Sequence, residues 1–204
     1  MMRSITVPFL GLLATLATAA AAPAQGSTSA ATSASPKKAH PAVPPSGAHA
    51  ASGDVKVNEF MSYDSTTKTV KLQIQAGLDG VKPPPKMGPF NFNGGSLADQ
   101  TVTVPVGWTV QYHFVNHDAV PHSFIIIAPS QPLPMAPETP AIPRAYSDKV
   151  TEGLFTEGTS DGNFRASKAG TYLLYCGVPG HGPSGMYINF VVSADAKSPS
   201  YTKG

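Results

Sequence analysis

The chain of 204 residues has little charge and only one cysteine, Cys176. Lys and Arg number 14 and Asp and Glu 12, so the chain lacks the basic excess that nucleic-acid binding needs. A single cysteine cannot form an internal disulfide. We therefore exclude polynucleotide binding and a disulfide framework, and the lone thiol needs another explanation.

The first 24 residues have the pattern of an export signal. Arg3 is followed by an apolar stretch from Ile5 to Ala19 and by the small-residue cleavage pattern Ala22-Pro23-Ala24. We expect residues 1–24 to be a signal peptide, or an uncleaved membrane anchor, since residues 5–22 are about long enough to span a bilayer. Either alternative places the rest of the chain in the periplasm or at the cell surface, where a free thiol is open to oxidation unless it is buried or bound to a metal.

Residues 25–53 contain Ala, Ser, Pro and Gly and almost no large apolar side chain. Such a segment cannot bury enough surface to offset the entropy of ordering, so we expect a flexible, disordered linker, which includes His40 and His49. Three of the 14 basic residues precede Asp54, which leaves 11 basic and 12 acidic residues in a nearly neutral domain at residues 54–204.

The domain also lacks any convincing helical periodicity with caps, and it is rich in short β-type runs separated by turn residues. The expected strands are Val55–Met61, Thr69–Gln75, Gln100–Val106, Thr109–Val115, Ser123–Ala128, Gly170–Cys176 and Met186–Val192. We therefore predict an all-β domain, an antiparallel sandwich or Greek-key barrel. Six prolines between Pro129 and Pro143 indicate a stiff loop, either a plain connection or a lid or docking surface.

The stretch YCGVPGHGPSGMY, residues 175–187, places Cys176, His181 and Met186 in one loop with the spacing C-x4-H-x4-M. A thiolate, an imidazole and a thioether form a soft ligand set that suits copper in both oxidation states. The glycines permit a tight turn and the prolines stiffen it, so three side chains can reach a common point. The loop predicts three ligands of one copper ion.

The fourth ligand must come from another segment, and His122 in the stretch NHDAVPHSFIII is the preferred candidate. It stands where a turn leads into an apolar strand, so its ring can point off the end of the sheet. His113, inside an expected strand, and His117, in an expected surface turn, are the alternatives. Two His, one Cys and a weak axial Met are the ligands of a blue copper electron-transfer site.

Each ligand also has an ordinary explanation. A lone cysteine is most often a small buried apolar residue, and a methionine that opens a strand is usually part of the core. The combination in one Gly/Pro-rich loop, with a suitable histidine elsewhere, favours the metal site.

Four segments, FNFNGGS, VPVGWTVQYHFVN, PHSF and LYCGVPGHGPSGMY, resemble the cupredoxins, and within them the sulfocyanin and rusticyanin group. The resemblance extends from about Asp54 to Val192. It implies a cupredoxin sandwich, a mononuclear type 1 copper bound by His122, Cys176, His181 and Met186, and one-electron transfer in a respiratory chain. In archaeal relatives the N-terminal segment can remain as a membrane anchor.

Two other functions fit the sequence less well. Copper enzymes such as nitrite reductases need a second copper, commonly connected through a histidine beside the cysteine, whereas Gly177 follows Cys176 and no His-x-His pair occurs. A copper store would cluster its methionines, which here are scattered. We expect an electron carrier and not an enzyme, monomeric, with redox partners such as c-type cytochromes or a terminal oxidase or reductase.

His181 has a second expected role, and three further residues have expected roles beside the metal. We expect the His181 ring edge to reach the surface within an apolar patch and to serve as the electron port. Ser123 is expected to donate its backbone N–H to the Cys176 sulfur and to lock the local turn with its hydroxyl. Asn116 and Asp118 are either turn formers that hold the His122 loop or plain surface residues.

Overall fold

The computed structural model describes residues 53–137 and 139–204. The expected signal or anchor, and the expected linker except for Gly53, lie outside the described residues. In the described part of the chain, no helix has the length and apolar character needed to cross a membrane.

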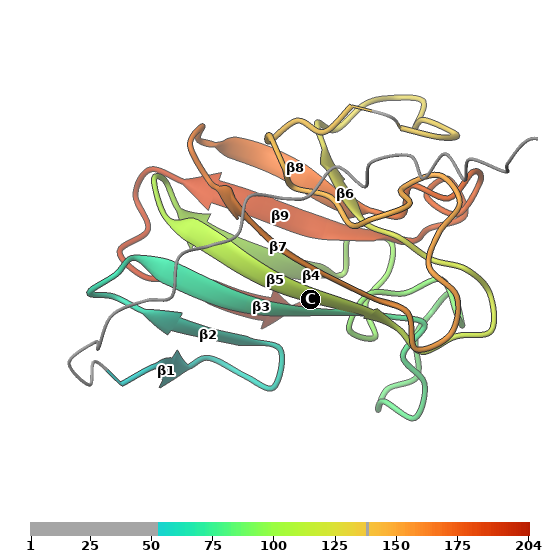
Figure 1. Ribbon diagram of the computed structural model, residues 1–204, viewed down its shortest axis with the longest axis horizontal. Helices are drawn as coiled ribbons and strands as arrows, with labels where there is room; N and C mark the ends of the chain where they lie inside the picture. The colour runs from blue at the N-terminus through green and yellow to red at the C-terminus, as the bar shows by residue number, and fades with distance from the viewer. Residues whose placement is uncertain (1–52, 138) are drawn as a thin grey trace, which may run out of the picture. The chain divides into compact units, whose positions relative to one another are not determined.

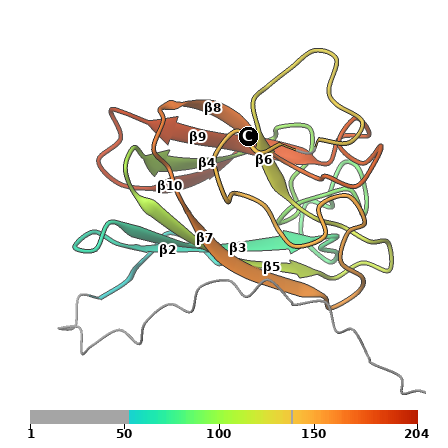
Figure 2. The same ribbon diagram turned by 45° about the horizontal axis from the view of Figure 1, so that its top comes forward.

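Two five-stranded sheets, formed from ten strands in the described residues, face each other as separate layers (Figures 1 and 2). The first sheet has the order β1-β2-β3-β5-β7, and the second has the order β10-β4-β9-β8-β6. The strands are β1 Val55–Lys56, β2 Met61–Asp64, β3 Thr69–Ala76, β4 Gln100–Pro105, β5 Thr109–Asn116, β6 Ile125–Ile127, β7 Thr159–Arg165, β8 Gly170–Tyr175, β9 Tyr187–Ser193 and β10 Ser200–Lys203. The predicted all-β sandwich is confirmed.

The strand directions and some strand limits differ from expectation. β3 pairs with β5 and β4 pairs with β9 in parallel, so the sandwich is mixed and not purely antiparallel. The expected strand Val55–Met61 is wrong, because Asn58 accepts a hydrogen bond from the Phe60 backbone and turns the chain between β1 and β2. β7 and β10 were not expected, since their sequences are rich in polar residues.

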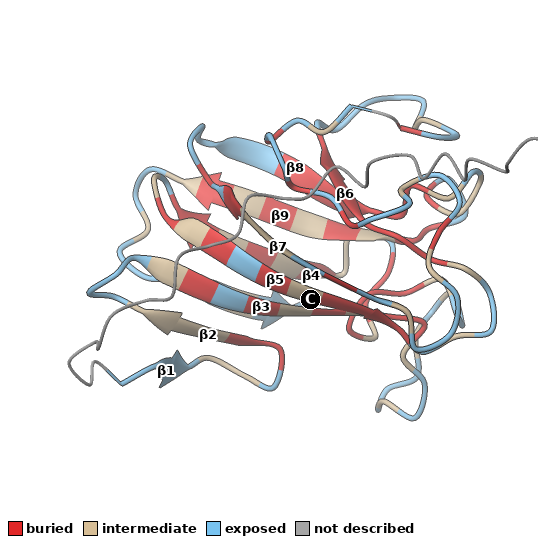
Figure 3. Cartoon of the chain, viewed as in Figure 1, coloured by how far each residue is buried: buried red, intermediate tan, exposed pale blue. Residues whose placement is uncertain are grey.

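Buried residues from strands of both sheets form the core. Figure 3 shows buried positions along the strands of both layers. In β3 and β9 buried residues alternate with more exposed ones, as in a strand that has one wet face. All three residues of β6 are buried, so this apolar strand is covered on both sides. The predicted ligands lie at one end of the sandwich, in the loops that precede β6 and β9.

The Pro-rich loop, residues 129–143, packs against the domain at both of its ends. Near its end, the Ala141 backbone N–H donates to the Ile126 carbonyl, and Ile142 is buried. Near its start, the Pro134 carbonyl accepts the Tyr175 hydroxyl and the Met135 carbonyl accepts the Gly180 N–H. The loop therefore connects β6 with the segment that holds Cys176 and His181.

Candidate metal centre

His122 lies before β6 and is held by backbone pairing with another loop. Its N–H donates to the Leu154 carbonyl at 3.1 Å, and the Leu154 N–H donates back to its carbonyl at 2.7 Å. Asn116, at the end of β5, donates from its side-chain amide to the carbonyls of Asp118, Val120 and Leu154. Asn116 is fully buried, and its bonds to the Asp118 and Val120 carbonyls hold the turn that follows β5. The turn-forming role expected for it is confirmed.

The loop between β8 and β9, residues 176–186, folds back on itself through main-chain hydrogen bonds. The Cys176 N–H donates to the Met186 carbonyl, and the Met186 N–H donates to the His181 carbonyl, both at 3.1 Å. Two glycines are required for close packing or conformation: a Cβ at Gly182 would overlap the Tyr175 ring, and Gly180 has φ +83°. The loop thereby returns its cysteine, histidine and methionine to neighbouring positions.

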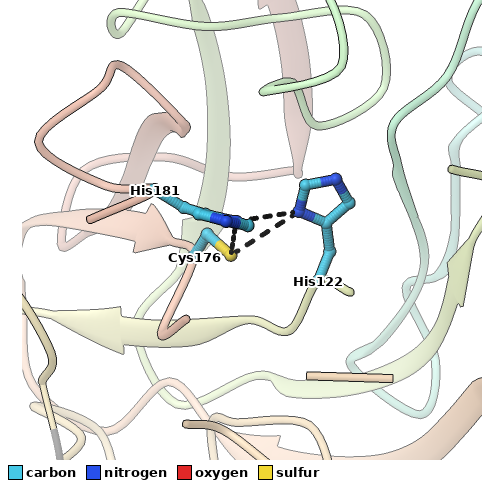
Figure 4. Close-up of side chains that lie close together, drawn as sticks. All are labelled: His122, Cys176 and His181. Atoms are coloured by element: carbon cyan, nitrogen blue, oxygen red, sulfur yellow. Dashed lines mark hydrogen bonds between the residues drawn. The ribbon is translucent and has the colours of Figure 1, made fainter. Parts of the chain in front are cut away.

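Three predicted ligands converge at this end of the sandwich (Figure 4). The two histidine Nδ1 atoms lie 3.2 Å apart, and the Cys176 sulfur lies 3.9 Å from His122 Nδ1 and 3.6 Å from His181 Nδ1. A point in the plane of these atoms lies about 2.1 Å from each of them, within the usual range of about 2.0–2.3 Å for metal–nitrogen and metal–sulfur bonds. The arrangement fits a trigonal His2Cys site around one metal ion.

Met186, the fourth predicted ligand, is fully buried beside these three residues. Its backbone bonds to both Cys176 and His181 place it at the same end of the core. The thiolate, imidazole and thioether donors form a soft set that selects copper over calcium or magnesium.

Burial affects the ionisation of all three converging groups. It raises the pKa of the Cys176 thiol, an effect opposed by hydrogen bonds from the backbone of Ser123 and Val178. It lowers the pKa of His122, with the Asp118 carboxylate acting in the opposite direction. Burial, together with repulsion from His122, lowers the pKa of His181 to about 4. Both imidazoles are therefore neutral at pH 7, as metal ligation requires, and a bound metal would keep the thiol ionised.

Ser123 lies at the site as expected, but its hydroxyl has a different role from the predicted one. Its backbone acts against the rise in the pKa of the Cys176 thiol, in keeping with the expected backbone contact to the sulfur. Its hydroxyl donates to the Val150 carbonyl and accepts the Gly177 N–H, so it joins distant segments and does not lock the local turn. Ser123 thus connects the loop that carries His122 with the loop that carries Cys176.

The two alternative histidines face other partners. Nδ1 of His113 lies 2.8 Å from an Asp161 oxygen, and Nδ1 of His117 lies 3.1 Å from a Glu157 oxygen. Both side chains are more than one third exposed, at 39% and 34%. Neither belongs to the group of converging ligands.

Sequence reasoning missed two neighbours of the site. The Phe90 ring packs edge-on against the His181 ring at 4.8 Å and the His122 ring at 6.1 Å. The Asp118 carboxylate lies 3.2 Å from His122 Nε2, and it was expected only as a turn former or surface residue. The spacing of four residues between Asp118 and His122 did not predict this contact, because the conformation of the turn between them, which sets the direction of the carboxylate, could not be read from the sequence.

Comparison with known proteins agrees with this site. Residues 56–203 match the family described as the sulfocyanin (SoxE) domain. The chain is 31% identical over 144 residues to sulfocyanin from Sulfolobus acidocaldarius, covering 67% of this chain and 70% of that protein. It is 30% identical over 132 residues to rusticyanin from Acidithiobacillus ferrooxidans, covering 61% of this chain and 77% of that protein.

Among solved structures, crystal structures of two rusticyanin variants cover 68% of this chain and 85% of theirs, with 26% identity and a TM-score of 0.45. The family match spans well over half of the chain, and it includes every predicted ligand. The family's members are cupredoxin electron carriers and not enzymes. The chain therefore belongs to the sulfocyanin family of blue copper cupredoxins.

Proposed function

We propose that this protein carries single electrons between redox proteins of an extracytoplasmic respiratory chain. The observation that carries the proposal is the convergence of His122, Cys176 and His181 at one buried end of a rigid sandwich. These three residues, together with Met186, would hold one copper ion. When bound, the copper would supply a one-electron couple between Cu(I) and Cu(II).

The protein keeps the ligand positions similar in both oxidation states. Cys176 and Met186 are joined by a main-chain hydrogen bond, and Ser123 connects the Cys176 loop to the His122 segment. Such restraints leave little room for the ligands to move when the charge of the metal changes, which keeps the barrier to electron transfer low.

His181 is the proposed electron port because it is only half-buried, whereas His122 and Cys176 are fully buried. Its surroundings are weakly polar: Pro179 is exposed, and the neighbouring Met135 is 63% exposed. A small apolar surface suits brief docking with redox partners. We propose c-type cytochromes or a terminal oxidase or reductase as these partners, in the periplasm or at the cell surface.

The experiment begins with copper loading, followed by visible and EPR spectra, which should show an intense thiolate charge-transfer band. The reduced protein is then mixed rapidly with an oxidised c-type cytochrome, and the second-order rate constant is measured from the absorbance change. Because the domain is nearly neutral, the rate constant should change little with ionic strength.

Matched variants locate the docking surface. Met135→Lys should lower the rate constant about tenfold, since an unpaired ammonium group in an apolar contact costs on the order of 1.4 kcal/mol. Val106→Lys adds the same charge at the other end of β9, where the Val106 N–H bonds to the Ser193 carbonyl, and it should leave the rate constant unchanged. Equal effects of both variants would reject His181 as the port, and a colourless copper-treated protein would reject the function itself.

A further inference from the structure

The buried copper ligand His122 has a carboxylate behind it. Its Nδ1 faces the metal position, and its Nε2 lies 3.2 Å from Oδ2 of Asp118. The His122 side chain is fully buried and that of Asp118 is 21% exposed, so water screens this contact only in part. Within the described residues, the other imidazole ligand, His181, has no corresponding partner for its Nε2.

The local structure is built to hold this carboxylate in place. The Asp118 N–H donates to the Asn116 side-chain oxygen at 2.9 Å, and the Asp118 carbonyl accepts the Thr156 hydroxyl at 2.8 Å. A Cβ on Gly77, where φ is +65°, would lie 2.4 Å from the Asp118 Cβ. Only glycine at position 77 thus leaves room for Asp118 in this position.

The two carboxylate oxygens have separate partners. Oδ1 accepts the Ala119 N–H at 2.7 Å, which is an ordinary turn contact. Oδ2 is directed at the imidazole, although Asn116 already holds the turn through three carbonyls. The turn does not need the contact between Oδ2 and His122, so this contact points to a role at the imidazole.

We propose that Asp118 is a positioning residue for His122, fixing its ring orientation and its tautomer and thereby favouring Cu(II) over Cu(I). A carboxylate can only accept from the ring, so the proton resides on Nε2 and the Nδ1 lone pair stays directed at the metal. The negative charge also makes the imidazole a stronger donor, and a stronger donor stabilises the more highly charged ion. The proposal depends on His122 binding copper.

The central experiment compares the copper-loaded protein with its Asp118→Asn variant by spectroelectrochemical titration. Asparagine keeps the shape and a turn-forming oxygen but removes the charge. The affinity for Cu(II) relative to Cu(I) should fall about tenfold, which corresponds to a rise of about 59 mV in the one-electron potential. The visible band should persist, because Cys176 is unchanged.

Two control variants separate this effect from general ones. Glu157→Gln removes a nearby carboxylate that faces His117, so it tests long-range charge. Thr156→Val removes a hydrogen bond to the Asp118 backbone, so it tests loosening of the same turn. Each should change the affinity ratio less than twofold, because in Thr156→Val the bond to Asn116 and the close packing against Gly77 still hold Asp118. A shift in Thr156→Val as large as that in Asp118→Asn would overturn the proposal.

A second measurement decides the matter if Asp118→Asn loses copper. Nitrogen-15 NMR of the copper-free proteins should show His122 as the Nε2–H tautomer in the wild type and an increased share of Nδ1–H in the variant. A wild-type His122 protonated on Nδ1 would overturn the proposal. A wild-type protein that never binds copper would instead refute the electron-carrier function, whereas a blue wild type with an unshifted Asp118→Asn potential would refute only the role of Asp118.

Discussion

The two segments that supply the copper ligands are fixed by different kinds of contact. His122 is paired through its backbone with Leu154, and polar side chains from earlier in the chain support it further: the buried Asn116, which ends β5, and the partly buried Asp118. Cys176, His181 and Met186 belong to the loop between β8 and β9, which is held largely by its own main chain.

The difference follows from the number of ligands that each segment must position. The loop of residues 176–186 carries three ligands, so hydrogen bonds between their own backbones set the ligand positions directly. The other segment carries one ligand, so it has no second ligand residue with which backbone hydrogen bonds could fix the orientation of the His122 ring. Its orientation therefore depends on side chains that contact the ring or brace the turn.

Exposure also differs between the two histidines. His122 is fully buried, whereas His181 is half-buried and close to the exposed Pro179. The His122 segment is therefore expected to act as the fixed support of the site, and the His181 side is expected to face redox partners.

The largest expected effect comes from exchanging each histidine for glycine. His181→Gly should lose the blue band and regain it when imidazole is added, because a small ligand can enter from the surface. His122→Gly should also lose the band, but imidazole should restore little of it, since the vacated space is enclosed by protein. Visible titration with imidazole measures both outcomes.

Circular dichroism and thermal unfolding of both glycine variants provide the control for folding. Equal rescue of the two folded variants would contradict the difference in access between the two sides. Failure of imidazole to rescue a folded His181→Gly would show that His181 is enclosed or is no ligand.

The second prediction concerns the support of the His122 segment. Asn116→Ala removes an amide that serves three carbonyls, and it should lower the free energy of unfolding by about 2–3 kcal/mol, because buried polar groups lose their partners. Asn189→Ala is the matched control, since its amide also bridges two segments but lies on β9, away from His122.

Chemical denaturation with and without copper distinguishes local from global effects. Asn116→Ala should also weaken copper binding, whereas Asn189→Ala should only lower stability. If both variants lost stability equally and kept the same copper affinity, Asn116 would have no special connection to the site.

Sequence reasoning performed best where chemistry and position coincide along the chain. Cys176, His181 and Met186 are close in sequence and separated by glycines and prolines, so their convergence followed from local rules. His122 could be preferred over His113 and His117 because it precedes an apolar strand, and the structure confirms that it meets Cys176 and His181.

The features that were missed depend on contacts between distant segments. β7 and β10 have polar sequences and become strands through pairing with β5 and β4, so their own residues gave little signal. Phe90 reaches both histidine rings from a loop about 30 residues before His122. No periodicity or spacing in a single sequence encodes such contacts.

The third prediction tests the methionine of the copper loop. Met186→Leu nearly conserves volume in a buried position, so the free energy of unfolding should change by less than about 1.5 kcal/mol. If Met186 is the axial ligand, the loss of its weak donor should disfavour Cu(II) and raise the reduction potential while the blue band remains. An unchanged potential in a folded, copper-loaded variant would remove Met186 from the site.

The smallest expected effect concerns the Pro-rich loop, residues 129–143, which adds an outside support to the copper loop. The hydroxyl of the buried Tyr175 donates to the Pro134 carbonyl at 2.5 Å, immediately before Cys176 in the chain. Tyr175→Phe removes this hydrogen bond but keeps the ring against which Gly182 packs. The free energy of unfolding should fall by about 1 kcal/mol, the usual net value of one hydrogen bond.

The informative comparison is between this variant and Tyr112→Phe, which removes a similar hydroxyl bond to the Tyr146 carbonyl, at a residue outside the ligand-bearing segments. Both variants should lose similar stability, since each leaves one carbonyl without its donor. Only Tyr175→Phe should broaden the EPR and visible signals of the copper, because loosening the start of the copper loop permits a spread of ligand positions. If the two variants gave identical spectra, the main chain of residues 176–186 would be sufficient to fix its three ligands, and the Pro-rich loop would contribute stability alone.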